Sequence, residues 1–481
     1  MSKVVERGAR LSARALVGLL GEWNGDGHAY VALAERLRLL IRDGRVPAGT
    51  RLPSEREIAA ALRRSRTTVV AAYQALRETG HLVSVRGSGS VATLPHAEAA
   101  SQHAVDFAHA LSPPVEGLDE LVASMGKDFL AALDGPEVDL LGNPGLRTAV
   151  AQRFTERGLP TAPDQILITL GAQHAIALVA HTLLHRGDHA LVESPTYPYA
   201  YEALRRAGAR LTVTPVSAEG WDIDHLIDLL GRLRPALAYL MPDFHNPTGA
   251  SMLPEDRVRV LTAARRAGTT LLVDETTAEL TIDRPWDDGP FARHGHRMTG
   301  AGSTVLTVGS LSKTVWGGLR LGWVRAERSI IQRLVQARPA GDLGNPQMEQ
   351  MVGVRVMQAL PDLLNRRSAQ LRAHRDALCR HVRDRLPTWQ VPMVQGGLSL
   401  WVGLDRPVSS ALALLCHTRG LAISAGPRFT VDGSHERFLR LPFTAPLPDL
   451  ERGITVLADC WNEIQSSPHR VPADQHLPSV L

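Results

Sequence analysis

The chain has 481 residues, of which 44% are apolar and 21% charged, and its formal net charge is +4. This length exceeds one ordinary domain and allows a large core with an accessory module. The 3 cysteines are widely spaced and show no metal-ligand spacing, and no apolar run reaches about 18 residues. The composition therefore argues against a disulfide scaffold, an exported protein and a membrane-spanning protein, and it predicts a cytosolic compartment.

The charge is distributed unevenly along the chain. Residues 1–92 contain 15 Lys and Arg against 8 Asp and Glu, a net charge of +7, whereas the remainder has a net charge of −3. A basic N-terminal module on a mildly acidic body predicts that the smaller part binds a polyanion.

Three helices are predicted in the basic part. The first spans residues 29–42, where leucines recur at helical spacing. Ser54 and Glu57 form a Ser-x-x-Glu capping box that begins the second helix. The third begins at Ser65 and ends before Gly80. Two short helices joined by a tight turn, the second opening with arginine and hydroxyl groups, suit entry into the major groove of DNA.

A small hairpin is predicted next, formed by residues 81–85 and 90–92. Glycines in its turn allow close approach to a phosphate or to a minor groove. Together the elements of residues 1–92 predict a winged helix-turn-helix domain of the α+β class, and the alternative is a basic helical module that binds protein. Residues 93–104 lack an apolar pattern and predict a linker, which reaches at most about 40 Å when extended.

This region resembles the GntR-type DNA-binding domain over residues 28–93. The resemblance rests on Gly44-Arg45, on the run Gly49-Thr-Arg-Leu-Pro-Ser-Glu-Arg56, on Ser65-Arg-Thr-Thr68, and on Gly80 followed by Arg86-Gly87-Ser-Gly89. It implies binding to a double-stranded DNA operator through Ser54, Arg56, Ser65, Arg66, Thr67, Thr68, Arg86 and Gly87.

From about residue 118, helix-like and strand-like segments alternate, which predicts an α/β sheet with helices on both faces. The predicted strands include residues 164–170, 189–193, 269–275 and 304–308. After the first of these, Gly171-Ala172-Gln173 opens a helix. Small residues at a helix start present free backbone N–H groups and the positive end of the helix dipole, which suits a phosphate.

Chemically suggestive residues follow the other strands. Tyr197 is placed to stack on a flat ring, or else it is a packed core tyrosine. Asn246 lies in an Asn-Pro-Thr-Gly turn, and its amide can donate to a phenolic oxygen. Asp274 ends a buried strand, where a carboxylate can keep a pyridine nitrogen protonated.

Lys313 lies in the run Ser310-Leu-Ser312-Lys313, directly after a β-prone segment, and Arg320 follows seven positions later. A lysine amine can form a Schiff base with an aldehyde cofactor. Serine hydroxyls and an arginine can hold a phosphate. Taken alone, this stretch is equally consistent with a surface lysine in a glycine-rich loop.

In this order, the features resemble the fold-type I aminotransferases, which bind pyridoxal 5′-phosphate (PLP), over residues 105–465. The resemblance implies a large mixed sheet with helices on both faces, a small C-terminal α+β subdomain, and a flexible tail at 466–481. It assigns Lys313 to a Schiff base with PLP and Arg440 to a substrate carboxylate, the alternative for Arg440 being a helical cation without a role. The implied cofactor contacts come from Ala172, Gln173, Tyr197, Asn246, Asp274, Thr276, Ser310, Ser312, Lys313 and Arg320.

A GntR-type module fused to such a domain resembles the MocR family of transcriptional regulators. The resemblance implies a homodimer, whose DNA modules often reach over the other subunit, and a large domain that senses an amino compound by Schiff-base exchange at Lys313. Thr276 and Thr277 stand where relatives place a tyrosine, and the short loop 140–145 also lacks one. Both departures remove PLP contacts and argue against physiological transaminase turnover.

Two alternatives to amino-compound sensing stay open. The protein is an active aminotransferase with an autoregulatory DNA-binding domain, or it is a sensor of PLP itself. Residual half-reaction activity is compatible with all three hypotheses.

Overall fold

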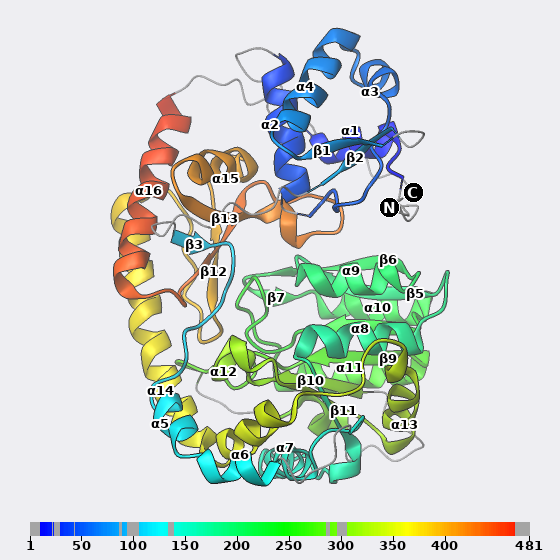
Figure 1. The fold of residues 1–481 in the computed structure, drawn as a ribbon, viewed down its shortest axis with the longest axis vertical. Helices are drawn as coiled ribbons and strands as arrows, with labels where there is room; N and C mark the ends of the chain where they lie inside the picture. The colour runs from blue at the N-terminus through cyan, green and yellow to red at the C-terminus, as the bar shows by residue number, and fades with distance from the viewer. Residues whose placement is uncertain are drawn as a thin grey trace.

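The structure is a computed structural model that describes residues 10–21, 23, 29–42, 44–85, 89–93, 105–132, 139–284, 289–295 and 305–466. Arg86, Gly87, residues 94–104 of the predicted linker and residues 467–481 of the predicted tail lie outside these residues. Figure 1 shows an N-terminal module at the top, a small domain below it and a large domain at the bottom.

The N-terminal module has the helix order and hairpin expected of a winged helix-turn-helix. Its elements are α1 (Ala13–Leu20), α2 (Ala29–Arg42), α3 (Glu55–Leu62), α4 (Arg66–Glu78), β1 (Leu82–Val85) and β2 (Gly89–Ala92). The predicted capping box forms, because Ser54 Oγ accepts from the Glu57 N–H at 3.3 Å and Glu57 Oε2 accepts from the Ser54 N–H at 2.8 Å. Buried residues such as Leu37, Ile58 and Tyr73 fill one common core.

The large domain contains a mixed sheet of eight strands in the order β4-β11-β10-β9-β8-β5-β6-β7. The strands from β10 to β6 in this order run parallel, and β11, β4 and β7 pair antiparallel at the two ends. The strands are β4 (Ile166–Thr169), β5 (His189–Ser194), β6 (Arg210–Ser217), β7 (Gly220–Trp221), β8 (Leu237–Leu240), β9 (Thr270–Asp274), β10 (Val305–Ser310) and β11 (Gly322–Arg325).

Helices cover both faces of this sheet. They are α5 (Leu118–Ala123), α6 (Gly126–Ala132), α7 (Pro144–Glu156), α8 (Ala172–Leu183), α9 (Pro198–Arg206), α10 (Ile223–Leu233), α11 (Pro254–Ala267), α12 (Leu311–Thr314) and α13 (Arg328–Ala337). Residues of β9 alternate between the faces: Leu271 and Val273 pack with α7, α10 and α11, and Leu272 packs with α8, α9 and α13. This alternation is the two-residue period of a buried strand.

The small domain is built on a second, four-stranded sheet of order β12-β14-β13-β3. Its first strand in the chain, β3, pairs parallel with β13, so the start of the effector region is anchored in the C-terminal subdomain. The elements are β3 (Val105–Phe107), α14 (Gln347–Arg385), β12 (Ser399–Gly403), α15 (Ser409–Thr418), β13 (Leu421–Ala425), β14 (Phe438–Pro442) and α16 (Leu447–Ser466).

Short 3₁₀ helices complete the described residues: η1 (Pro163–Gln165), η2 (Phe291–Gly295), η3 (Gly317–Leu319), η4 (Arg338–Ala340) and η5 (Gly426–Phe429). None of the described helices combines the length and the apolar character needed to cross a membrane.

The DNA-binding module contacts the small domain of its own chain. Arg36 of α2 donates to Glu436 at 3.0 Å, and Arg45 donates to Ser410 Oγ of α15 at 3.4 Å. Only 14% of the Arg36 side chain and 26% of the Glu436 side chain are exposed, so this ion pair is partly shielded from water.

Candidate functional site

A cavity of about 520 Å³ lies between the large and small domains. The carboxyl ends of β8, β9 and β10 meet at one edge of the large sheet, which is where open α/β sheets bind ligands. Every residue that the sequence places around the cofactor or its substrate lines this cavity: Ala172, Gln173, Tyr197, Asn246, Asp274, Thr276, Ser310, Ser312, Lys313, Arg320 and Arg440.

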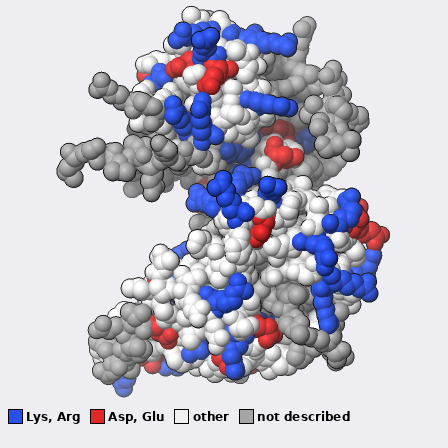
Figure 2. All heavy atoms as spheres, turned by 90° about the vertical axis from the view of Figure 1, so that its right-hand side faces the viewer, with Lys and Arg blue, Asp and Glu red and all other residues white. Residues whose placement is uncertain are grey.

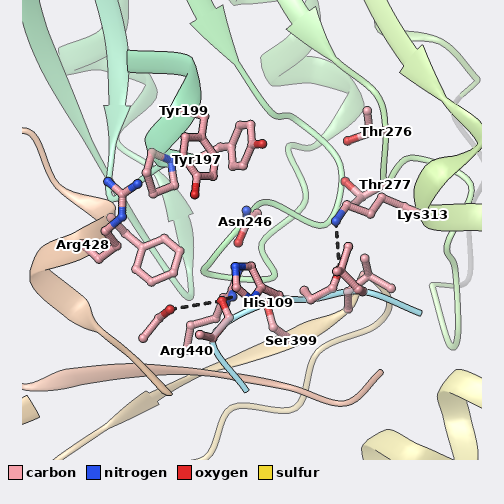
Figure 3. Close-up of a pocket in the computed structure, with 18 of the residues that line it drawn as sticks. His109, Tyr197, Tyr199, Asn246, Thr276, Thr277, Lys313, Ser399, Arg428 and Arg440 are labelled. Carbon is pink, nitrogen blue, oxygen red and sulfur yellow. Dashed lines mark hydrogen bonds between the residues drawn. The ribbon is translucent and has the colours of Figure 1, made fainter. Parts of the chain in front are cut away.

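Lys313 is held on the short helix α12, directly after β10. Ser310 fixes this turn, because its hydroxyl donates to the Leu321 carbonyl at 2.9 Å and accepts from the Ser312 N–H at 3.0 Å. The Lys313 amine donates to the Ala110 carbonyl at 2.8 Å, and a dashed line from Lys313 marks this bond in Figure 3. Burial and, to a smaller extent, the charge of Arg440 lower the pKa of Lys313 to about 8, although Asp274 opposes the change.

The lowered pKa predicts a pH dependence for aldehyde capture. The neutral amine is the nucleophile, so the reactive fraction of Lys313 grows as pH rises through about 8 and is small below it. The rate at which the cofactor-free protein reacts with PLP should therefore level off above this pH. Stopped-flow absorbance against pH measures the midpoint, and a midpoint near the ordinary lysine value would contradict the buried environment.

The phosphate end of the site is formed by the start of α8 and by the loop before β11. Ala172 and Gln173 are the first residues of α8, so their backbone N–H groups lie at its positive end. Arg320 donates to the Leu170 carbonyl at 3.2 Å. The Ser312 hydroxyl is buried and has no hydrogen-bond partner among the described residues, as expected of a donor kept for a ligand.

The ring end contains Tyr197, Asn246 and Asp274. The Asn246 amide oxygen is buried without a partner in the described part of the chain. Asp274 is 2% exposed, and burial raises the pKa of its carboxyl group despite its hydrogen bonds. Thr276 donates to Asp274 Oδ1 through its N–H at 2.9 Å and its hydroxyl at 2.7 Å. These residues fit a pyridine ring with a phenolic oxygen and a protonated nitrogen.

Arg440 lies in the middle of β14 and not on a helix, which removes the structural alternative of a helical cation. Its guanidinium donates to the Ala108 carbonyl and lies 5.0 Å from the centre of the Phe429 ring. Burial lowers the pKa of Arg440 to about 10, so it remains charged at neutral pH. A buried guanidinium of this kind is suited to a carboxylate.

Sequence reasoning missed several residues of the site. Arg428 and His109 line the cavity (Figure 3), and Leu39 of α2 reaches its wall from the DNA-binding module. The segment after β3 supplies the carbonyls that Lys313 and Arg440 use. None of these carries a local motif. The pairing of residues 105–107 with residues 421–423, which are distant in the chain, brings this segment to the cavity.

The predicted DNA contacts that the structure describes lie on α3, at the start of α4 and at the N-caps of these helices. Arg56 and Arg66 are exposed there, as are Arg63 and Arg64 between the two helices, and Figure 2 shows basic side chains on the upper part of the molecule. Ser65 and Thr67 are exposed and Thr68 is half-buried. The hydroxyls of Ser54 and Ser65 cap the N-termini of α3 and α4, which orients the second helix.

The fold and the site define a PLP-dependent aminotransferase-like domain joined to a winged helix-turn-helix DNA-binding domain. The chain belongs to the aminotransferase class I and II family, which it matches over residues 126–457, and its residues 29–91 match the gntR family of bacterial regulatory proteins. This combination makes it a MocR-type transcriptional regulator.

Relatives of both kinds support this assignment. The chain is 25% identical to the uncharacterized HTH-type transcriptional regulator YdfD of Bacillus subtilis over 91% of its own length and 97% of the relative. It is 30% identical to the probable rhizopine catabolism regulatory protein MocR of Rhizobium meliloti, over 61% and 64% of the two chains. It is also 30% identical to the 2-aminoadipate transaminase of Thermus thermophilus, over 64% and 77%.

Among solved structures, the chain is similar to LysN, the α-aminoadipate aminotransferase of Thermus thermophilus, in complex with N-(5′-phosphopyridoxyl)-L-leucine. The TM-score is 0.69 at 27% identity, over 76% of this chain and 94% of the other. The ligand of that structure carries a phosphopyridoxyl group.

Proposed function

We propose that the large domain of this PLP-dependent regulator senses a small amino compound that carries a carboxylate. The observation behind the proposal is that a reactive amine, Lys313, and a buried guanidinium, Arg440, face one cavity whose wall includes Leu39 of the DNA-binding module. An amino acid can place its amino group near Lys313 and its carboxylate near Arg440.

The roles of the chain's own residues follow from their chemistry. When bound, PLP supplies an aldehyde that can exchange one amine for another. Lys313 would provide the amine that holds this aldehyde. Asp274 would hold a proton on the ring nitrogen, Ser312 and Arg320 would hold the phosphate, and Arg440 would orient the effector through its carboxylate.

The contact between α2 and the small domain supports a route to DNA. Glu436 precedes β14, which carries Arg440, and its carboxylate binds Arg36 of α2. Although burial acts to raise the pKa of Glu436, Arg36 and Ser410 keep it below its usual value, so the residue is charged. An effector whose carboxylate binds Arg440 therefore changes the position of α2, provided that the effector binds two arrangements of the small domain and the DNA-binding module with different affinity.

Replacing Glu436 with glutamine should uncouple the two domains. The shift in operator affinity produced by a mixture of amino compounds should fall by about tenfold, since a hydrogen bond between charged groups is lost. Fluorescence anisotropy on a promoter fragment measures the shift. Glu451→Gln is the control, because it removes an exposed pair with Arg385 in the same domain. Equal coupling in wild type and Glu436→Gln would refute this route.

Exposed apolar side chains support a homodimer. Leu343 is 62% exposed and Met348 is 50% exposed, near the start of α14, and Leu111 beside the cavity is 57% exposed. Large apolar side chains in contact with water favour burial against a partner. Light scattering after size exclusion should give twice the mass of 52.2 kDa, and Leu343→Glu should halve it. A wild-type monomer would contradict the dimer.

We place the working compartment in the cytoplasm, because a DNA operator is there. The alternative function, steady transamination, is tested by following keto-acid production with a panel of amino acids. Multiple turnovers per chain would favour the enzyme, and a single half-reaction would favour the sensor.

A further inference from the structure

Tyr239 lies in the middle of β8, next to β9, and is 0% exposed. Its hydroxyl donates to Asp274 Oδ2 at 2.7 Å. Tyr239 is not among the residues that line the cavity, so it contacts Asp274 from behind the cavity wall. This hydrogen bond between the buried phenol of Tyr239 and the buried carboxylate of Asp274 connects β8 to the site.

The hydrogen bonds that Asp274 accepts from the described residues leave one of its acceptor positions open. An ionised carboxylate has about four acceptor positions, two on each oxygen. On Oδ1, the N–H and the hydroxyl of Thr276 occupy both. On Oδ2, Tyr239 occupies one. The remaining position is on Oδ2, and Asp274 lines the cavity, so this position is available to the protonated nitrogen of a pyridine ring.

Tyr239 acts as a donor throughout the physiological pH range. Burial raises the pKa of its phenol well above the usual value, and the charge and hydrogen bond of Asp274 raise it further. Glu193 adds to this effect, and its own carboxylate accepts from Trp221 Nε1 at 2.8 Å and from the Met241 N–H at 2.9 Å. The phenol proton therefore stays on Tyr239 and points to Asp274.

We infer that Tyr239 is a positioning residue that keeps Asp274 ionised and turns one oxygen of it toward the coenzyme nitrogen. The inference rests on the proposed role of Asp274. Through Tyr239 and Asp274, β8 would influence how strongly the coenzyme ring withdraws electrons. Thr276 supplies the other hydrogen bonds to Asp274, through its N–H and its hydroxyl.

The consequence of losing the phenol follows from the charges. Burial raises the pKa of the Asp274 carboxyl, and the donors of Thr276 and Tyr239 oppose this change. Without the hydroxyl of Tyr239 the carboxylate is less stable and therefore more basic, so Asp274 competes more strongly with the ring nitrogen for the proton that lies between them. The ring nitrogen should then be protonated in a smaller fraction of the molecules at neutral pH.

The test uses the full-length protein loaded with PLP that carries ¹⁵N in the ring. The ¹⁵N chemical shift distinguishes the protonated from the free ring nitrogen, and the ratio of the two forms is measured at about pH 7 in wild type and Tyr239→Phe. This ratio should be about tenfold lower in Tyr239→Phe, and the dissociation constant of PLP should be about tenfold larger, as expected for one hydrogen bond to a charged group.

Three variants make the outcome decisive. Tyr73→Phe removes another buried hydroxyl, which donates to the Pro53 carbonyl in the DNA-binding module, and should leave the ratio of protonated to free ring nitrogen unchanged. Asp274→Asn should leave the ring nitrogen unprotonated. Tyr239→His retains a donor and should bring this ratio part of the way back to the wild-type value.

An unchanged ratio of protonated to free ring nitrogen in Tyr239→Phe would overturn the inference, even if the protein melts at a lower temperature, because the role would then be structural only. Equal ratios in Tyr239→Phe and Tyr239→His would overturn it as well. Failure of the wild type to bind PLP would instead contradict the proposed function.

Discussion

Replacing Lys313 with alanine is expected to abolish covalent retention of PLP and the response to amino compounds. The chain contains only 3 lysines, at positions 3, 127 and 313. Of these, Lys313 lines the cavity, and its pKa is lowered to about 8. A neutral amine is required for imine chemistry, and no arginine can replace it because guanidinium groups stay protonated.

Borohydride reduction followed by mass spectrometry measures this effect. Wild type should gain one phosphopyridoxyl group per chain, on the peptide that contains Lys313, and Lys313→Ala should gain none. Lys127→Ala is the matched control, since Lys127 is exposed on α6, and it should label like wild type. Labelling of Lys313→Ala to the wild-type level would show that the cofactor is held elsewhere.

Replacing Arg66 with alanine is expected to weaken operator binding by about 1–3 kcal/mol, the cost of one lost base contact. Arg66 is exposed at the first turn of α4, the helix that corresponds to the recognition helix of helix-turn-helix proteins. If Arg66 instead binds a phosphate, binding should weaken on all DNA sequences alike. The slope of log K against log salt concentration should then decrease in magnitude by about one.

Anisotropy titrations on the operator and on unrelated DNA, at several salt concentrations, separate these outcomes. Arg232→Ala is the control for loss of charge alone, because Arg232 lies on α10 of the large domain with its side chain 65% exposed. An Arg66→Ala protein with unaltered affinity and salt dependence would exclude α4 as the DNA-reading element.

Much of this architecture was predictable because the signals are local. Residues 29–42 form the expected helix, and the Ser54 capping box begins α3 where predicted. The strand ends at Asp274 and before Lys313 were also predictable, since an apolar run followed by a polar residue marks the carboxyl end of a buried strand. Parallel strands bring those ends to one edge.

The remaining features depend on pairing between distant segments. The contact between Tyr239 and Asp274 exists because β8 pairs with β9, and no local pattern near residue 239 specifies that neighbour. The carbonyls bonded to Lys313 and Arg440 come from a segment that reaches the site through the pairing of β3 with β13. Thr276 was expected at the cofactor, and the structure shows that its hydroxyl bonds to Asp274.

The most direct test of a regulator controlled through Lys313 is the operator affinity of PLP-loaded protein before and after adding a mixture of amino compounds. The account predicts a change of about tenfold in wild type, equivalent to roughly 1.4 kcal/mol of coupling, and no change in Lys313→Ala. The same change in both proteins, or no change in either, would contradict it.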